Sequence, residues 1–197
     1  MWDRLTLVTA PAVVAVSLAE AKEHLRVEAD DHDDDFLIQG LLDAAIATID
    51  GPEGIGAAMV TQTWRLSLDC LFSPIRVPIW PLRSVTGITY VDDDGATQTL
   101  SSSLYRVNTD RRPGVIERAY NASYPNVIAR SGAVKITFTA GFGSLAADTP
   151  RDLRAAILLI VGHLYANREA VVIGSPVATV PMAAEAILNR YRTGMVA

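Results

Sequence analysis

Six consecutive residues near the N-terminus could bind a divalent cation. They are Asp30, Asp31, His32, Asp33, Asp34 and Asp35. Carboxylate oxygens are the ligands that calcium prefers, but an EF-hand loop needs glycine at its sixth position and glutamate at its twelfth. Counted from Asp30, those positions hold Asp35 and Leu41. Because carboxylates at the start of a helix are stabilised by the helix dipole, the run favours a helix N-terminus over a metal site, and we expect neither a metal nor a cofactor.

Other patterns that could carry catalysis are incomplete. Gly51, Gly54 and Gly56 follow a predicted helix and precede a predicted strand, which is the reverse of the order in a dinucleotide-binding loop. The sequence contains no G-x-S-x-G motif, and its three histidines lack the H-E-x-x-H spacing of a zinc site. Cys70 is the single cysteine, so no intramolecular disulfide can form. The sequence therefore predicts a protein that is not an enzyme, although a site assembled from distant residues stays open.

Two adjacent cations stand at the tip of a predicted loop. Arg111 and Arg112 precede Pro113-Gly114, between predicted strands at residues 105–107 and 115–117. A solvated turn is the ordinary interpretation of such a pair. The functional interpretation is a contact with an acidic partner subunit or with passing DNA.

The composition points to a protein that binds other proteins. Half of the 197 residues are hydrophobic and 20% are charged, with a net charge of −5. The mean hydropathy of +0.23 is high for a chain without a membrane span, and such an apolar surplus is typical of subunit interfaces. A protein that binds duplex DNA tightly normally has an excess of basic residues. This chain has none, so DNA that passes near it is expected to move along its surface without being held.

Two apolar stretches do not predict a membrane segment. The first, residues 5–16, follows Asp3 and Arg4 and lacks the positive start of a signal peptide. The second, residues 153–165, contains Arg154 and His163 and is shorter than the ~20 residues that a bilayer requires.

The first and last zones of the chain have helical periodicity. Ser17 and Glu20 form a capping-box pattern that starts one helix, and a second helix runs from the acidic run to about Asp50. Thr149 and Pro150 predict an N-cap and a first helical position, followed by an apolar helix to about residue 168. Residues 170–184 carry no charge, and we expect an ordered apolar loop in this stretch. A last helix begins near its end, at about residue 181.

The middle zone, about residues 60–140, alternates with a period of two. Trp64, Leu66 and Leu68 alternate with polar residues, as apolar residues do in half-buried strands. The run 92–95 lies between two such stretches and predicts a hairpin. The predicted fold is therefore α+β, one domain with a small helical bundle core (residues 17–50 and 149–193) and an inserted antiparallel β-sheet region at about residues 60–140.

Several short motifs, spread in order over nearly the whole chain, resemble those of one family. They are residues 17–26 (SLAEAKEHLR) before the acidic run, 62–64 (QTW), 90–92 (YVD), 138–143 (FTAGFG), Pro150 with its apolar helix, and 165–169 (YANRE). The chain resembles the head–tail connectors, or head-completion adaptors, of long-tailed bacteriophages and phage-like gene transfer agents.

This resemblance implies a structural subunit that is made in the bacterial cytoplasm and built into the neck of a virion or phage-like particle. The family forms a ring of about a dozen copies under the portal protein by head-to-tail contacts. The ring extends the DNA channel without reading its sequence and provides a platform for a tail terminator or stopper protein. No membrane partner is implied.

The last helix is our candidate for portal docking. An exposed terminal helix that carries an aromatic residue and an arginine suits an interaction hot spot. The residues that we assign to this contact are Leu188, Tyr191, Arg192 and Met195. Two other functions stay open from the sequence, a soluble oligomeric interaction module outside any virus and an unrecognised metal-dependent enzyme that uses residues 30–35.

Overall fold

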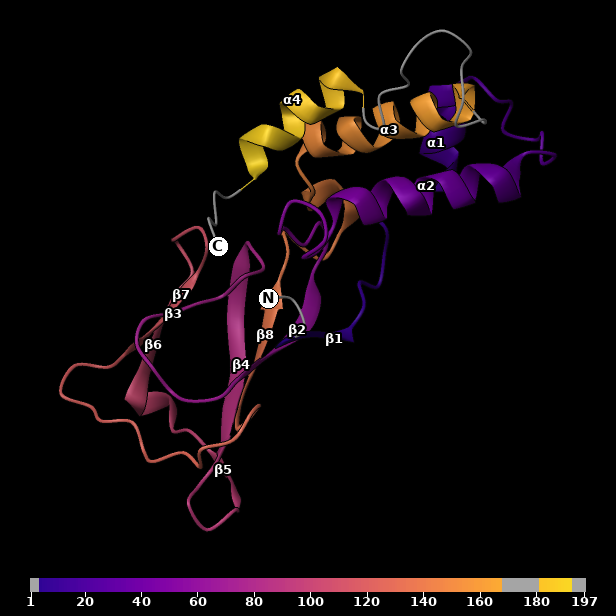
Figure 1. Cartoon of the computed structure of the whole chain (residues 1–197). Coiled ribbons are helices and arrows are strands. Elements are labelled where there is room, and N and C mark those ends of the chain that lie inside the picture. Colours follow the sequence, from indigo (N-terminus) through magenta and orange to yellow (C-terminus); the bar gives the residue numbers. More distant parts are fainter. Residues whose placement is uncertain (1–3, 168–180, 193–197) are drawn as a thin grey trace, which may run out of the picture. The chain divides into compact units, whose positions relative to one another are not determined.

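The computed structural model describes residues 4–167 and 181–192, and the chain divides into two compact units. The β unit consists of residues 1–12 and 61–142, and the helical unit of residues 13–60 and 143–197. Figure 1 shows the strands and the helices of the two units. Each unit is therefore assembled from two separate segments of the chain. The α+β class predicted from the sequence is confirmed.

Four α-helices make up the described part of the helical unit. They are α1 (Leu18–Leu25), α2 (Asp35–Ile49), α3 (Arg151–Ala166) and α4 (Met182–Tyr191). A short 3-10 helix, Ala146–Asp148, precedes α3. Within the described residues, no helix combines the length and the hydropathy needed to cross a bilayer.

Local hydrogen bonds fix the start of α1. The Ser17 hydroxyl accepts from the Glu20 N–H at 3.3 Å, and the Glu20 carboxylate accepts from the Ser17 N–H at 2.9 Å, so the predicted capping box is confirmed. This bond from the Ser17 N–H is the main reason why the pKa of Glu20 lies below its ordinary value. Helix α2 begins in the acidic run, as predicted, with Asp34 at the N-cap position.

The core of the helical unit lies along one face of α2 and one face of α3. Its α2 members recur at helical spacing and are fully buried: Ile38, Leu42, Ala45 and Ile49. Its α3 members are Leu153, Ala156, Ile157, Ile160 and Val161. From α3, Arg154 donates its Nε–H to the Ala15 carbonyl at 3.1 Å and also pairs with Glu20. This arginine therefore ties the start of α1 to α3.

The start of α3 differs from the sequence prediction. Pro150, not Thr149, occupies the N-cap position, and α3 begins at Arg151. The buried Thr149 hydroxyl instead donates to the Met59 carbonyl at 3.0 Å. A carbonyl that is shielded from water needs a hydrogen-bond donor, and this need outweighs helix capping at Thr149.

The β unit contains two antiparallel sheets. In the five-stranded sheet the order is β1 (Leu5–Thr9), β2 (Gln62–Leu68), β8 (Val134–Ala140), β4 (Leu82–Val91) and β5 (Thr97–Thr99). In the three-stranded sheet the order is β3 (Ile75–Arg76), β7 (Val115–Arg118) and β6 (Tyr105–Asn108).

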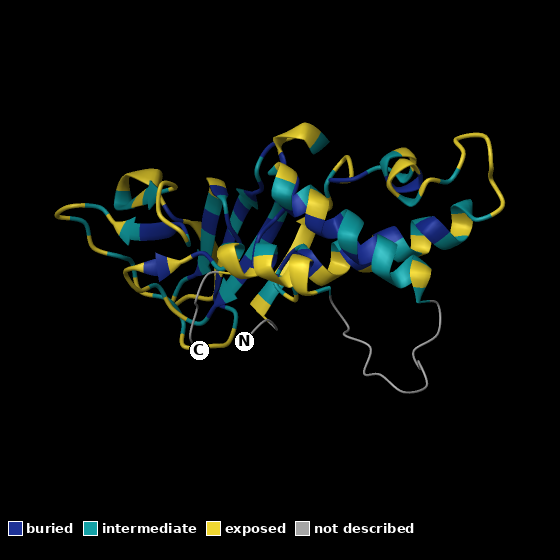
Figure 2. Cartoon of the chain, turned by 90° about the horizontal axis from the view of Figure 1, so that it is seen from above, coloured by how far each residue is buried: buried dark blue, intermediate teal, exposed yellow. Residues whose placement is uncertain are grey.

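The alternation read from the sequence is confirmed in β2 and β8. Trp64 lies opposite Phe138 and Leu66 opposite Ile136, and all four side chains are buried. The residues between them are less buried, as the colours along the strands in Figure 2 show. The predicted hairpin at residues 92–95 joins β4 to β5, with Gly95 at a φ of +83°. Such a positive φ strains a residue that has a Cβ atom, so this position favours glycine.

The first strand has no counterpart among the elements predicted from the sequence. Residues 5–9 form β1, which pairs with β2 and belongs to the β unit, so the helical zone does not extend to the N-terminus. Four of its five residues are exposed. Because apolar side chains lie on both faces of an exposed edge strand here, the usual alternation of a half-buried strand is missing.

Replacing either of two glycines of the helical unit with alanine should change the free energy of unfolding, but in opposite directions. A Cβ atom at Gly54 would overlap the backbone carbonyl group of Ile49, whereas a Cβ at Gly40 on α2 would meet no atom within 4 Å. We expect Gly54→Ala to lower the free energy of unfolding by about 2 kcal/mol through overpacking. Gly40→Ala should raise it by about 1 kcal/mol because alanine favours the helix. Urea denaturation measures both, and equal effects would contradict this packing.

Candidate functional site

The residues predicted to dock on the portal have different environments in α4. Leu188 is buried, with 2% of its surface exposed, and the Tyr191 hydroxyl donates to the Asp152 carboxylate on α3 at 2.7 Å. These two residues hold α4 against α3, so the exposed position assumed for Leu188 is wrong. Arg192 is exposed and donates to Asn189 at 2.9 Å. Met195 lies outside the described residues.

Helix α4 presents a separate surface to solvent. Met182, at its first turn, is 84% exposed. The other exposed residues are Ala183, Glu185, Ala186, Asn189, Arg190 and Arg192. We call this set the α4 outer face. It mixes apolar side chains with charges of both signs, and its Met182, Arg190 and Arg192 are of residue types enriched in protein interfaces.

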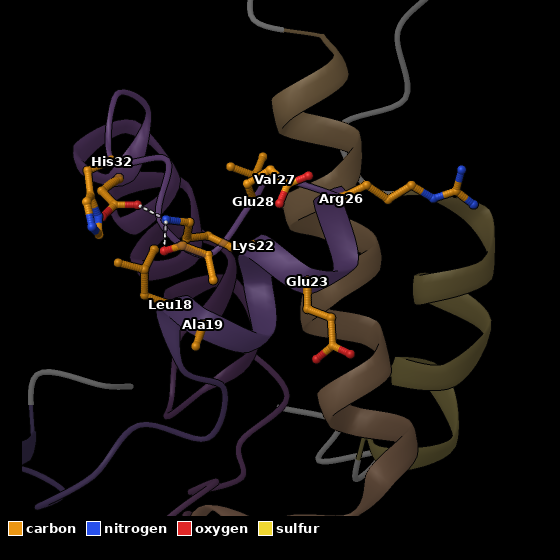
Figure 3. Close-up of a pocket in the computed structure, with 10 residues that line it drawn as sticks. Leu18, Ala19, Lys22, Glu23, Arg26, Val27, Glu28 and His32 are labelled. Carbon is orange, nitrogen blue, oxygen red and sulfur yellow. Dashed lines mark hydrogen bonds and ion pairs between the residues drawn. The ribbon is translucent and has the colours of Figure 1, made fainter.

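A buried lysine organises the acidic run. Lys22, on α1, is 4% exposed, and its ammonium group donates to the carbonyl oxygens of Ala29 and Asp31. It also forms an ion pair with Asp35 at 2.8 Å, and Asp35 accepts a second contact from His32 at 2.6 Å. Figure 3 shows Lys22 turned toward these partners. The lysine therefore closes the loop between α1 and α2.

The same residues line an open pocket of about 880 Å³ in the helical unit. Leu18, Ala19 and Val27 contribute apolar surface, whereas the side chains of Glu23 and Arg26 point away from Lys22 (Figure 3). The Asp35 carboxylate, which also lines the pocket, is engaged by Lys22 and His32. Among the described residues, no group of three His, Cys, Asp or Glu side chains is placed to hold a metal ion.

The two loop arginines of the β unit also have different roles. Arg112 stacks on the Trp80 ring, with 3.3 Å from its guanidinium carbon to the ring centroid. Trp80 in turn meets the Phe142 ring edge-on at 5.5 Å. Arg112 therefore serves the packing of its own unit through a cation–π contact. Arg111 and Arg112 are both exposed, and a partner or DNA contact at this turn stays a prediction.

Charge is distributed unevenly between the two units. The β unit has ten Lys and Arg against seven Asp and Glu, and the helical unit has seven against fifteen. Their formal charges are therefore +3 and −8. A basic unit and an acidic unit on one chain allow neighbouring copies to attract each other with opposite charges.

The two aromatic residues that are most exposed within the described ranges are not among the sites predicted from the sequence. Phe36 on α2 is 94% exposed, and Tyr120 in a loop of the β unit is 90% exposed. A signal for Phe36 was available in the sequence, because it lies two residues before Ile38 and therefore on the opposite face of α2 from the buried residues. Large exposed aromatic side chains are typical of interaction surfaces.

The ion pair of Asp35 should make stability depend on pH. Hydrogen bonds from Lys22 and then from His32 hold the pKa of Asp35 below its ordinary value. Such a carboxylate stabilises the fold above the unfolded pKa of about 3.9, and this contribution is lost as the pH falls through the lower folded pKa. We expect Asp35→Asn to lower the free energy of unfolding at pH 6 and to flatten its decline below about pH 4.

Urea denaturation between pH 6 and pH 2.5 measures this effect. Glu53→Gln, at an exposed position of the same unit, is the matched control and should keep the wild-type decline. A decline in Asp35→Asn as steep as in the wild type would contradict the role given to this carboxylate.

No family model matches the chain, and no curated protein matches it. Solved structures of gene transfer agent (GTA) particles do match over nearly the full length. A chain in the neck of an empty GTA particle, computed with C6 symmetry, has 31% identity and a TM-score of 0.79. A chain in the neck of a native GTA particle, computed with C12 symmetry, has 30% identity and a TM-score of 0.75. A chain in the virion of a native GTA particle has 29% identity and a TM-score of 0.78.

In all three comparisons the match covers 98% of this chain and 97% of the other. The likeness therefore includes both units and their connections, not one shared subdomain. Identity near 30% over this length accompanies close agreement of the backbone. The chain belongs to the family of gene transfer agent neck proteins.

Proposed function

We propose that the chain is a head–tail adaptor of a gene transfer agent or phage-like particle. In this role, about a dozen copies form a ring under the portal protein by repeated head-to-tail contacts. The ring extends the DNA channel and provides the platform to which a tail terminator or stopper protein binds. The chain performs no chemical reaction in this role.

The observation that supports this proposal most strongly is the full-length likeness to chains in particle necks. Those necks were computed with C6 and C12 symmetry, which fits a protein present in several copies around one axis. The acidic helical unit and the basic β unit suit contacts that repeat head to tail, because each copy then joins one surface to a different one.

The two alternatives drawn from the sequence have less support. In a metal-dependent enzyme that uses the acidic run, Asp35 could bind a metal ion only after its contacts with Lys22 and His32 were broken. Asp34 would likewise have to release the Tyr165 hydroxyl, which donates to it at 2.5 Å. A soluble oligomeric module outside any virus would not be expected to match neck chains over both units.

Removal of the gene tests the adaptor role. Cells that produce the particles but lack this chain should release DNA-filled heads without tails, because the tail platform is missing. Electron microscopy of purified particles counts heads with and without tails, and a plasmid copy of the gene should restore tails. Tailed particles at wild-type yield in the absence of the chain would contradict the proposal.

A substitution on the α4 outer face tests portal docking. Deleting all residues after Pro181 would not test docking alone, because the deletion would also remove Ala184 and Leu188, which are buried in the core. We expect Arg192→Glu to weaken binding to the purified portal about tenfold, which corresponds to about 1.4 kcal/mol. Its fold should persist, because its side chain is 53% exposed.

Arg130→Glu is the matched control, because it makes the same charge change at an exposed position of the β unit. Surface plasmon resonance with the full chain and the portal measures both affinities. If Arg192→Glu binds the portal as tightly as the wild type, Arg192 does not contribute to portal docking. That result would leave the proposed role in the neck standing.

A further inference from the structure

We propose that the free edge of β1 is an interface between neighbouring copies of this chain, at which a strand of the next copy adds to the five-stranded sheet. This inference rests on the proposed function, since it assigns one of the two contact surfaces that each ring subunit needs. The contact is a sheet extension, in which main-chain hydrogen bonds supply affinity and the side chains next to them supply selectivity.

The β1 edge is open in the described part of the chain. Strand β1 ends the five-stranded sheet and pairs there with β2 alone. Thr6, Leu7, Val8 and Thr9 are all exposed, and Leu7 and Val8 each have 43% of their surface exposed. One side of this strand therefore carries unpaired backbone N–H and C=O groups beside exposed apolar side chains.

The strand lacks two features that normally keep a sheet edge from pairing, a charged side chain and a proline, although it has a third, an irregular register. Its sequence, LTLVT, contains no charge and no proline. The nearest charge, on Arg4, is bound to Asp69 at 2.8 Å. A single irregularity between Leu7 and Thr9 interrupts its register with β2.

The other open edges are better protected. At the opposite edge of the same sheet, β5 has three residues and follows the acidic turn Asp92–Asp94, and the part of β4 that β5 does not cover carries the exposed Arg83. At the two edges of the smaller sheet, β3 and β6 carry the exposed Arg76 and Arg106. Charges and short length are common devices against unwanted strand pairing. Their absence from β1 indicates that this edge is covered in the assembled protein.

A second copy of this chain is the occupant that fits best. The related necks were computed with C6 and C12 symmetry, so copies lie side by side around an axis. DNA binding depends on positively charged side chains that neutralise phosphates, and β1 has none, so DNA is not the expected partner of this edge. Adjacent copies in a cyclic ring are not related by a two-fold axis, so β1 cannot pair with the same strand of its neighbour. The added strand is therefore a different segment of the next copy.

Site-specific photo-cross-linking in assembled particles tests this assignment. The photoreactive amino acid p-benzoylphenylalanine replaces Val8 in a tagged full-length chain, which is produced together with the untagged wild-type chain. Mixed necks then form even where the variant alone assembles poorly. After irradiation of purified particles, we expect a product near twice the 21.2 kDa chain mass that contains one tagged and one untagged copy.

The same replacement at Lys135 is the matched control, since Lys135 is exposed on β8, where the strand pairs with β2 on one side and with β4 on the other. It should give less than about a tenth of the two-copy product, because an interior strand has no free edge. Mass spectrometry identifies the partner peptide of the Val8 product. A Val8 product with a different protein, or no product, would overturn the inference while leaving the neck role intact. Absence of even the untagged chain from the particles would instead refute the proposed function, and the inference with it.

Discussion

The antiparallel pairing of β2 with β8 is the interaction on which the rest of the structure depends. Its register places Gln62 opposite Ala140, and both are buried. Residues 62 and 140 are far apart in sequence, yet the pairing brings them to neighbouring positions in one sheet. The chain can therefore leave the helical unit after residue 60 and return at residue 143. Only then can α2 and α3 share one core, because they belong to the two segments that this insertion separates.

The side chains that could do chemistry serve the packing of the chain instead. Lys22 and Asp35 close the loop before α2, and Arg154 joins α3 to the capping box of α1. Asp152 receives the Tyr191 hydroxyl and so fixes α4, and Arg112 lies on Trp80. Several large apolar and aromatic residues are exposed on different elements, which suits a protein whose role is to contact other subunits.

The elements with one buried face could be predicted from the sequence. Alternation in β2 and β8, the capping box at Ser17 and the hairpin at residues 92–95 each follow from a local pattern, and the structure contains all three. Strand β1 could not be predicted, because an edge strand exposed on both faces leaves no alternation. The burial of Lys22 and of Leu188 could not be predicted either. Each depends on a part of the chain outside the local pattern. Lys22 is buried by its contacts with the loop at residues 29–31, and Leu188 by the packing of α4 on α3.

The central claim is that this chain is a ring subunit of a particle neck. The most direct measurement is a cryo-electron microscopy map of the neck of particles made by cells that encode the chain, refined without imposed symmetry. We predict a ring of repeated densities around the DNA channel in which both units and the side chains of this sequence can be traced. A neck at side-chain resolution in which every ring is accounted for by other sequences would contradict the claim.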